Sequence, residues 1–183
     1  MSGIHNLAML KIQSALQTAL IDNIPATDKA RAGVIALGPL QGDPDPDTAR
    51  ISVSIFENDP DAVLGKEGSA ETLRWIDTIY DIEVGGCITW QRRFCIKARC
   101  LLENTGEDLL TANDIASTVR SRIEQALLSC KFTNVLADSG EYVSRGVFAS
   151  SLRGDMLQSG GPGAYDFHIK VRFELLTTIS IGV

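Results

Sequence analysis

Cysteine and histidine are the residue types of this chain whose spacing could bind a transition metal. The sequence contains four cysteines and two histidines: Cys87, Cys95, Cys100, Cys130, His5 and His168. No CxxC or HxxxH spacing occurs, and a structural zinc site needs four ligands that converge. Because the chain does not start with a signal-peptide pattern, we expect reduced thiols rather than disulfides. The sequence therefore predicts no zinc site and no cofactor.

Three aspartates at alternate positions, Asp43, Asp45 and Asp47, resemble the start of a calcium-binding loop. Such a loop needs glycine at its sixth position and glutamate at its twelfth. Thr48 and Ser54 stand at those two positions. We therefore predict a stiff acidic surface loop here and no metal site.

Catalytic motifs are missing from the sequence. It has no GxxxxGK[ST] phosphate loop, no GxGxxG fingerprint and no GxSxG nucleophile elbow. Neither histidine has an evident nucleophile partner, and His168 falls at a polar position of a predicted strand. We therefore predict no catalytic residues and a protein that is not an enzyme.

Composition is that of an ordinary globular domain, with 183 residues, 44% hydrophobic residues and 22% charged residues. A single domain over residues 1–183 is the natural expectation at this length. The net charge of −6 disfavours attraction to nucleic acid or to an anionic membrane. No apolar run approaches the ~20 residues of a membrane-spanning helix.

Charge is distributed unevenly along the chain. Asp22 to Glu83 carries 13 acidic and 5 basic residues, whereas Cys87 to Leu101 carries four basic residues and no acidic one. This asymmetry predicts two surfaces of opposite sign. They either meet between subunits or are simply solvated.

The longest predicted element is a β-hairpin over Tyr80–Leu102, closed by the turn residues Gly85 and Gly86. After the turn, side chains alternate in period two, which is typical of a strand buried on one face. The apolar positions are Ile88, Trp90, Phe94, Ile96 and Ala98, and the polar positions are Thr89, Gln91, Arg93, Lys97 and Arg99.

Two amphipathic helices are predicted to position this hairpin. One spans residues 4–21; the other follows a capping box at Thr105–Asp108 and runs to about Ser129. Further strands are expected over residues 33–38, 51–56, 142–157 and 166–181. The predicted fold class is therefore α+β: a mainly antiparallel β-sheet with long hairpins, packed by the N-terminal helix and the second helix.

A long excursion over residues 57–78 leaves the predicted sheet, with Trp75 among its few apolar anchors and room for one helical turn. Long loops in compact domains are commonly functional, so we expect this one to contact a partner. Ile179 and Ile181 keep the C-terminal strand apolar. We expect that strand to be an exposed edge that a neighbouring subunit covers.

Three segments, Asp81–Phe94, Asp114–Glu124 and Tyr165–Phe173, together resemble the small neck and tail proteins of long-tailed bacteriophages. The organisation is most similar to the tail terminator, or tail completion, proteins. The resemblance covers most of the chain and is one of pattern and length.

The resemblance implies an α+β subunit of a homo-oligomeric, hexameric ring at the head-proximal end of the tail tube. Such a ring stops tube polymerisation and joins the tail to the head-completion or stopper protein. Double-stranded DNA passes through its lumen without specific binding. The implied location is the virion, with assembly in the host cytoplasm and no membrane contact.

The ring hypothesis gives a set of candidate subunit-interface residues. They are a basic strand face, an acidic region and three apolar positions: Arg93, Lys97, Arg99, Asp43, Asp45, Asp47, Asp59, Asp61, Trp75, Ile179 and Ile181. One alternative is a head–tail connector or stopper subunit of the neck. Another, of a different class, is a small cytoplasmic α+β enzyme or ligand-binding domain. A DNA-binding factor is disfavoured by the charge.

Overall fold

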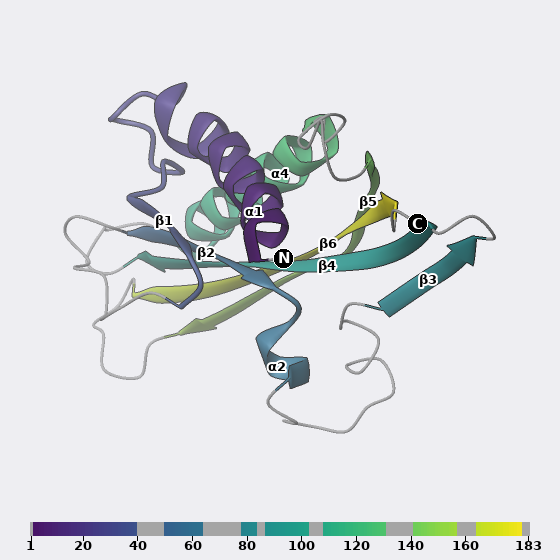
Figure 1. The fold of residues 1–183 in the computed structure, drawn as a ribbon. Coiled ribbons are helices and arrows are strands. Elements are labelled where there is room, and N and C mark those ends of the chain that lie inside the picture. Colours follow the sequence, from purple (N-terminus) through teal and green to yellow (C-terminus); the bar gives the residue numbers. More distant parts are fainter. Residues whose placement is uncertain are drawn as a thin grey trace.

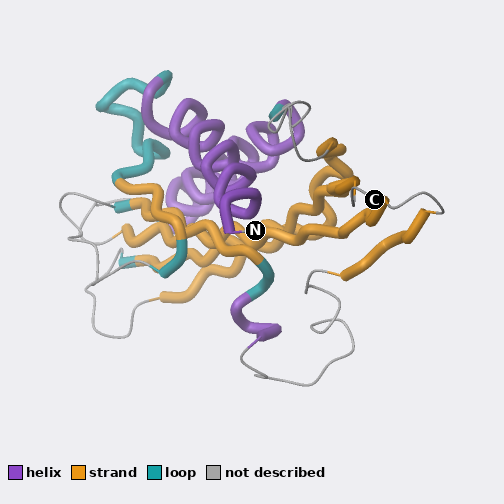
Figure 2. Tube along the Cα trace, viewed as in Figure 1, coloured by secondary structure: helices purple, strands orange, loops and turns teal. Residues whose placement is uncertain are grey.

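The computed structural model describes residues 2–39, 50–63, 78–83, 87–102, 108–130, 141–156 and 164–180. Figures 1 and 2 show two helices over one face of a curved sheet and a short third helix on the other face. The elements in chain order are α1 (Ser2–Gln17), the π-helical turn η1 (Thr18–Asp22), β1 (Val34–Leu37), β2 (Ile51–Glu57), α2 (Pro60–Val63), β3 (Thr78–Glu83), β4 (Cys87–Leu102), α4 (Leu109–Ser129), β5 (Glu141–Met156) and β6 (Tyr165–Ser180).

The strands form one sheet in the order β1-β2-β4-β6-β5, and β3 also pairs with β4. β1 and β2 are parallel, whereas all other described pairs are antiparallel. The predicted α+β class and mainly antiparallel sheet are therefore confirmed. β4 and β6 pair along their whole length, from Cys87 opposite Ser180 to Leu102 opposite Tyr165.

β2 and β3 occupy successive stretches of the same edge of β4. β2 pairs with residues 94–100 of β4, and β3 pairs with residues 87–91. Between them the chain leaves the sheet at Asn58, whose φ of 65° is the left-handed conformation that asparagine tolerates. This exit leads directly into α2, the single helical turn expected in the excursion. Residues 64–77 of that excursion lie outside the described residues.

α1 and α4 pack on the same face of the sheet (Figure 1). α4 begins at Leu109, and its N-cap is Asp108, whose carboxylate accepts a hydrogen bond from the Thr111 amide at 2.7 Å. The capping box with Thr105 as the cap was therefore wrong, because the acid predicted to reach back is itself the cap. As expected for an amphipathic helix, α4 buries one stripe of side chains: Ala112, Ile115, Ala116, Val119, Ile123, Ala126 and Leu127.

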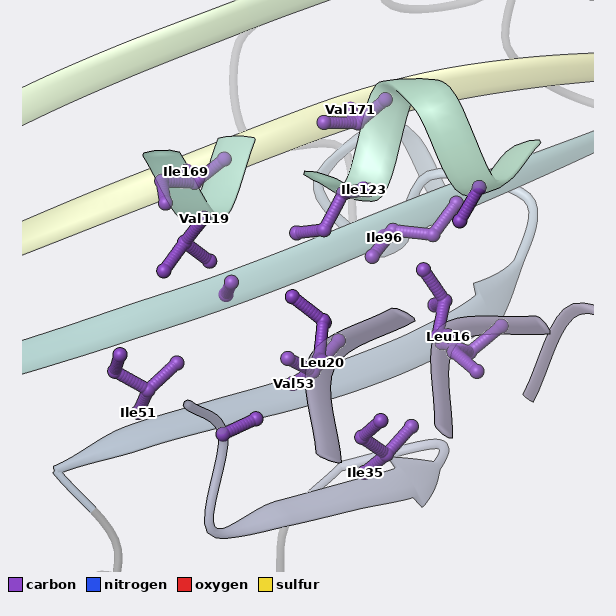
Figure 3. Packing of buried hydrophobic residues seen from close by; sticks show 14 of the residues in the cluster. Leu16, Leu20, Ile35, Ile51, Val53, Ile96, Val119, Ile123, Ile169 and Val171 are labelled. Atoms are coloured by element: carbon purple, nitrogen blue, oxygen red, sulfur yellow. The ribbon is translucent and has the colours of Figure 1, made fainter. Parts of the chain in front are cut away.

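The core lies between these helices and the sheet. Figure 3 shows Leu16 of α1 and Leu20 of η1 close to Val53 and Ile96 of the sheet. In the same view, Ile123 of α4 lies over the sheet. The apolar residues that alternate with the charged residues of β6 are all buried: Phe167, Ile169, Val171, Phe173 and Leu175. The buried side chains, which recur every second residue on the strands and every 3.6 residues on the helices, therefore form one apolar layer.

As far as Thr178, the C-terminal strand β6 is an inner strand, so the expected exposed edge does not occur there. This strand lies between β4 and β5, and Thr178 has a partner on each side. Ile179 is opposite Ile88 of β4, while Ile181 lies outside the described residues. The outer strands of the described sheet are β1 and β5, together with β3, which pairs with β4 alone among the described strands.

Candidate functional site

The sheet face opposite α1 and α4 carries charged side chains from its two central strands. Their alternation with core residues places them there, since successive side chains of a strand point to opposite faces. The charged residues of this face are Arg93, Lys97, Arg99, Asp166, His168, Lys170, Arg172 and Glu174. We call this set, together with Asp59 and Asp61, the charged face.

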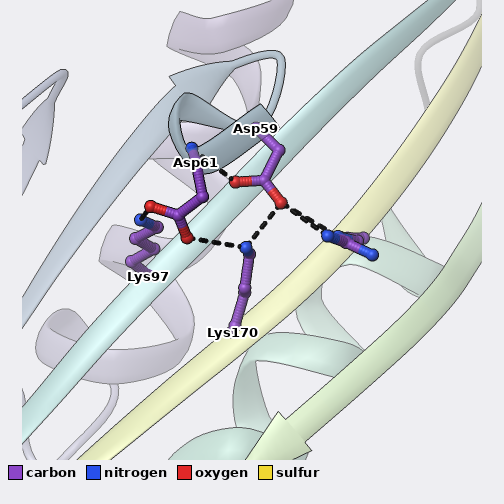
Figure 4. A network of polar contacts seen from close by, with 5 residues as sticks. Asp59, Asp61, Lys97 and Lys170 are labelled. Carbon is purple, nitrogen blue, oxygen red and sulfur yellow. Dashed lines mark hydrogen bonds and ion pairs between the residues drawn. The ribbon is translucent and has the colours of Figure 1, made fainter. Parts of the chain in front are cut away.

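α2 is attached to the charged face by two carboxylates (Figure 4). The Asp59 side chain is 0% exposed and forms ion pairs with Lys170 and Arg172. Arg172 donates from Nε at 3.1 Å and from its terminal nitrogen at 2.7 Å to the same carboxylate oxygen. The other oxygen of Asp59 accepts the Asp61 amide at 3.1 Å, so Asp59 also caps the helical turn.

Asp61 joins the two central strands. One carboxylate oxygen accepts from Lys97 of β4 at 2.9 Å, and the other accepts from Lys170 of β6 at 2.8 Å. The hydrogen bond from Lys170 and, second, that from Lys97 lower the pKa of Asp61 to about 2. Burial acts to raise the pKa of Asp59, but the hydrogen bonds from Lys170 and Arg172 outweigh it and hold that pKa below its usual value. Both groups are therefore ionised at neutral pH.

Further ion pairs lie on both sides of α2. Arg93 pairs with the buried Glu174 at 3.3 Å. Arg99 donates from two nitrogens to the Asp166 carboxylate at 2.8–3.1 Å. The imidazole of His168 lies 3.3 Å from the same Asp166 carboxylate and is 53% exposed, as its polar strand position predicted. This geometry makes the charged face a set of charge pairs within one chain.

Five of the predicted subunit-interface residues lie on the charged face. The structure brings Asp59 and Asp61 to the basic strand, where Lys97 and Asp61 are in direct contact. Arg93 and Arg99 are paired with acids of β6. The acidic and basic segments, which the sequence allowed to meet between subunits, thus contact each other within one chain. The role of these residues between subunits stays a prediction.

The remaining interface candidates cannot be placed. Asp43, Asp45, Asp47, Trp75 and Ile181 lie outside the described residues, as does the predicted turn at Gly85 and Gly86.

Sequence reasoning missed the β6 half of the charged face. Lys170, Arg172 and Glu174 lie in the strand predicted over residues 166–181, but they were not predicted to pair with the acidic excursion. Arg172 and Asp59 are 113 positions apart in the chain, so no local pattern links them. The one available signal was the Asp59-Pro60-Asp61 sequence, which is typical of a capped helix start.

An apolar groove lies at the start of α4, on the helix side of the sheet. It has a volume of about 630 Å³ and is lined by Leu109, Leu110, Asn113, Gly154, Asp155, Tyr165 and Phe167. Leu109 and Leu110 are 57% and 70% exposed. Sequence analysis missed this groove, although two leucines ahead of the buried stripe of α4 were a visible signal. Contiguous apolar surface of this kind marks interaction sites.

Burial makes two of the cysteine thiols poor nucleophiles. It raises the pKa values of Cys95 and Cys100 to about 12, so neither forms a thiolate at neutral pH. Within the described residues, no three His, Cys, Asp or Glu side chains gather in a way that could hold a metal ion. None of the helices described here combines the length and apolar character that crossing a membrane requires.

No known protein-family model matches this chain, and no curated protein matches it.

Proposed function

We propose that this protein is a structural subunit of a phage neck, acting as a tail terminator that forms a ring at the head-proximal end of the tail tube. The apolar groove at the start of α4 is the observation that carries the assembly role. Leu109 and Leu110 expose large apolar side chains beside the aromatic rings of Tyr165 and Phe167. Burying such surface against a second protein is favourable by ~25 cal/mol for each Å² removed from water.

The two-layer arrangement supports the same role. Both long helices cover one face of the sheet, and Asp59 and Asp61 at the start of α2 pair with basic side chains of the other face. A two-layer body of this kind is a suitable building block for a ring. In a ring, one patch contacts a different patch on the next copy. The choice of tail terminator among assembly proteins rests on the sequence resemblance.

The test mixes the purified chain with tail tubes of the same phage and images the mixture by negative-stain electron microscopy. We expect rings about as wide as the tube, or caps on one tube end only. Particles that ignore the tubes but bind a portal-side ring would instead assign the chain to a head–tail connector. Particles that bind neither would contradict a neck role.

Two exposed leucines of the same helix provide a matched pair of variants for this test. Leu110→Ser changes the groove, whereas Leu128→Ser changes a 62% exposed leucine at the other end of α4. We expect Leu110→Ser to lose ring or cap formation while it keeps the fold, and Leu128→Ser to behave as the natural chain. Equal assembly by both variants would show that the groove has no part in it.

A further inference from the structure

The outer edge of β5 is a regular strand with one partner. Among the described strands β5 pairs with β6 alone, so its other side carries backbone groups with no strand beside them. Irregularities interrupt the pairing at Ser144–Gly146 and at Val147–Ala149, but the register from Ala149 to Met156 is continuous. Bulges protect sheet edges, and a regular stretch without them is a template for another strand.

The printed backbone bonds determine which β5 residues face outward. The Leu101 amide of β4 donates to the Arg50 carbonyl at 2.8 Å, so odd-numbered residues of β4 direct their backbone groups toward β2. Even-numbered residues of β4 therefore face β6, and the alternation continues through β6 to β5. The residues whose amides and carbonyls point away from the sheet are Ser150, Leu152, Gly154 and Met156.

The side chains flanking Gly154 carry opposite charges. Arg153 is 79% exposed and Asp155 is 49% exposed, and within one chain the two form an ion pair at 3.3 Å across Gly154. In an antiparallel pair related by a twofold axis at residue 154, residue 153 of each copy is opposite residue 155 of the other. Such an edge is complementary to itself, because each arginine then faces an aspartate.

We propose that the outer edge of β5 binds the same edge of a second copy of this chain, antiparallel and centred on Gly154. The pairing extends the sheet across two copies, with Arg153 opposite Asp155 of the second copy and Leu152 opposite its Met156. Gly154, Leu152 and Met156 are outward-facing residues, so this register makes about six backbone hydrogen bonds. A register centred on Leu152 would place Arg153 opposite Ser151, so that neither charge would face an opposite charge on the second copy.

Gly154 also suits the centre of the contact. A Cβ at this position would lie 2.5 Å from the Phe167 ring, so the ring occupies the space of a side chain. Two glycines opposite each other let the backbones approach without a side chain between them.

The contact does not depend on the proposed neck function. It uses the backbone edge of β5, whereas ring or cap formation is assigned to the groove, which shares Gly154 and Asp155 with that edge. Arg153 does not line that groove. The single change Arg153→Asp therefore tests the second-copy contact without altering a groove residue, whereas the combined variant also changes Asp155 of the groove.

A charge-swap series tests the proposal, with mass measured by sedimentation equilibrium over a range of protein concentrations. We expect a monomer–dimer equilibrium for the natural chain. Arg153→Asp places like charges opposite each other twice and should weaken the dimer roughly tenfold or more. Arg153→Asp combined with Asp155→Arg restores opposite pairs and should recover most of that loss. Both side chains are exposed, so the folded monomer should persist in every variant.

Residue-resolved amide exchange is the second readout. In the dimer, the amides of Leu152, Gly154 and Met156 should become protected as concentration rises, while those of Ser151, Arg153 and Asp155 are protected throughout. A chain that stays monomeric at every concentration would overturn the proposal. So would a dimer in which Arg153→Asp has no effect and the outward amides stay unprotected.

Discussion

At the residue scale, Asp59 is the most constrained charge in the described chain. Its carboxylate is fully buried and is held by Lys170 and Arg172. We expect Asp59→Asn to lower the free energy of unfolding by about 3 kcal/mol, because it removes the buried carboxylate that faces two partly buried cations. Urea denaturation of both proteins measures the difference. Asp155→Asn, at an exposed ion pair, is the control and should change stability by less than ~0.5 kcal/mol.

The same network predicts how stability depends on pH. The pKa of Asp61 is about 2 in the folded chain, whereas an unfolded aspartate has a pKa of ~3.9. The unfolded state therefore binds more protons between these values. The stabilisation is complete above about pH 4 and is lost as the pH falls through the folded pKa of Asp61. Asp59 and Asp28 also have lowered pKa values and contribute in the same direction.

We expect urea midpoints to be steady near neutral pH and to fall progressively below about pH 4. The double variant Asp59→Asn with Asp61→Asn should be less stable at neutral pH and should show a shallower fall. An unchanged pH dependence in that variant would mean that other carboxylates dominate acid unfolding.

The charge pairs also change how an assembly experiment should be designed. Reversing Arg93 and Arg99 would place new carboxylates beside Glu174 and Asp166, which are both nearly buried. Loss of assembly in that double variant would therefore report loss of the fold. The exposed positions Leu110 and Arg153 are better probes of contacts between molecules.

At the element scale, α4 supplies the side chains that bind the helical layer to the sheet. Ile123 is fully buried in its stripe, whereas Leu128 on the same helix is exposed. We expect Ile123→Ala to destabilise the chain by about 3 kcal/mol, since it removes buried methyl groups and leaves a cavity. Leu128→Ala should be close to neutral. Thermal or urea unfolding of the two variants makes the comparison, and equal losses would contradict this packing.

Because Gly154 of β5 has no side chain, the Phe167 ring of β6 can pack directly against its backbone. The Phe167 ring fills that space and is itself buried in the core. Gly154→Ala should cost about 1–3 kcal/mol, because the ring must move out of a packed position. Ser151→Ala, on the same strand and exposed, is the control for a change of side chain alone. A stable Gly154→Ala variant with unchanged near-ultraviolet circular dichroism would show that the ring can relocate freely.

At the scale of the whole molecule, stability should be highest in the centre of the sheet. β6 is paired on both sides and its core face is buried, whereas α2 is one helical turn held by side chains. We expect the amides of Ile169 and Val171 to exchange only through global unfolding, and the amides of α2 to exchange through local opening. Hydrogen exchange followed by NMR distinguishes the two. Equal protection would mean that α2 belongs to the cooperative core.

The periodicity of single segments was sufficient to predict most elements of this fold. The buried stripe of α4 and the alternation in β4 and β6 follow from side-chain spacing, because a helix and a strand each repeat their faces at a fixed local period. The α+β class follows from the order of these segments. Exact helix starts were less accessible: Thr105 and Asp108 are both capping residue types, and only the backbone distinguishes them.

Tertiary structure alone decided which charges meet. The acidic excursion and the basic strands were visible as separate features, but Asp61 lies 36 positions from Lys97 and 109 from Lys170. Their contact depends on the left-handed turn at Asn58 and on β4 and β6 being neighbours in the sheet. The same pairing put β6 inside the sheet and left β5 at its edge. Pairing between distant strands is a property of the whole chain, so local sequence determined the elements while their packing determined the surfaces.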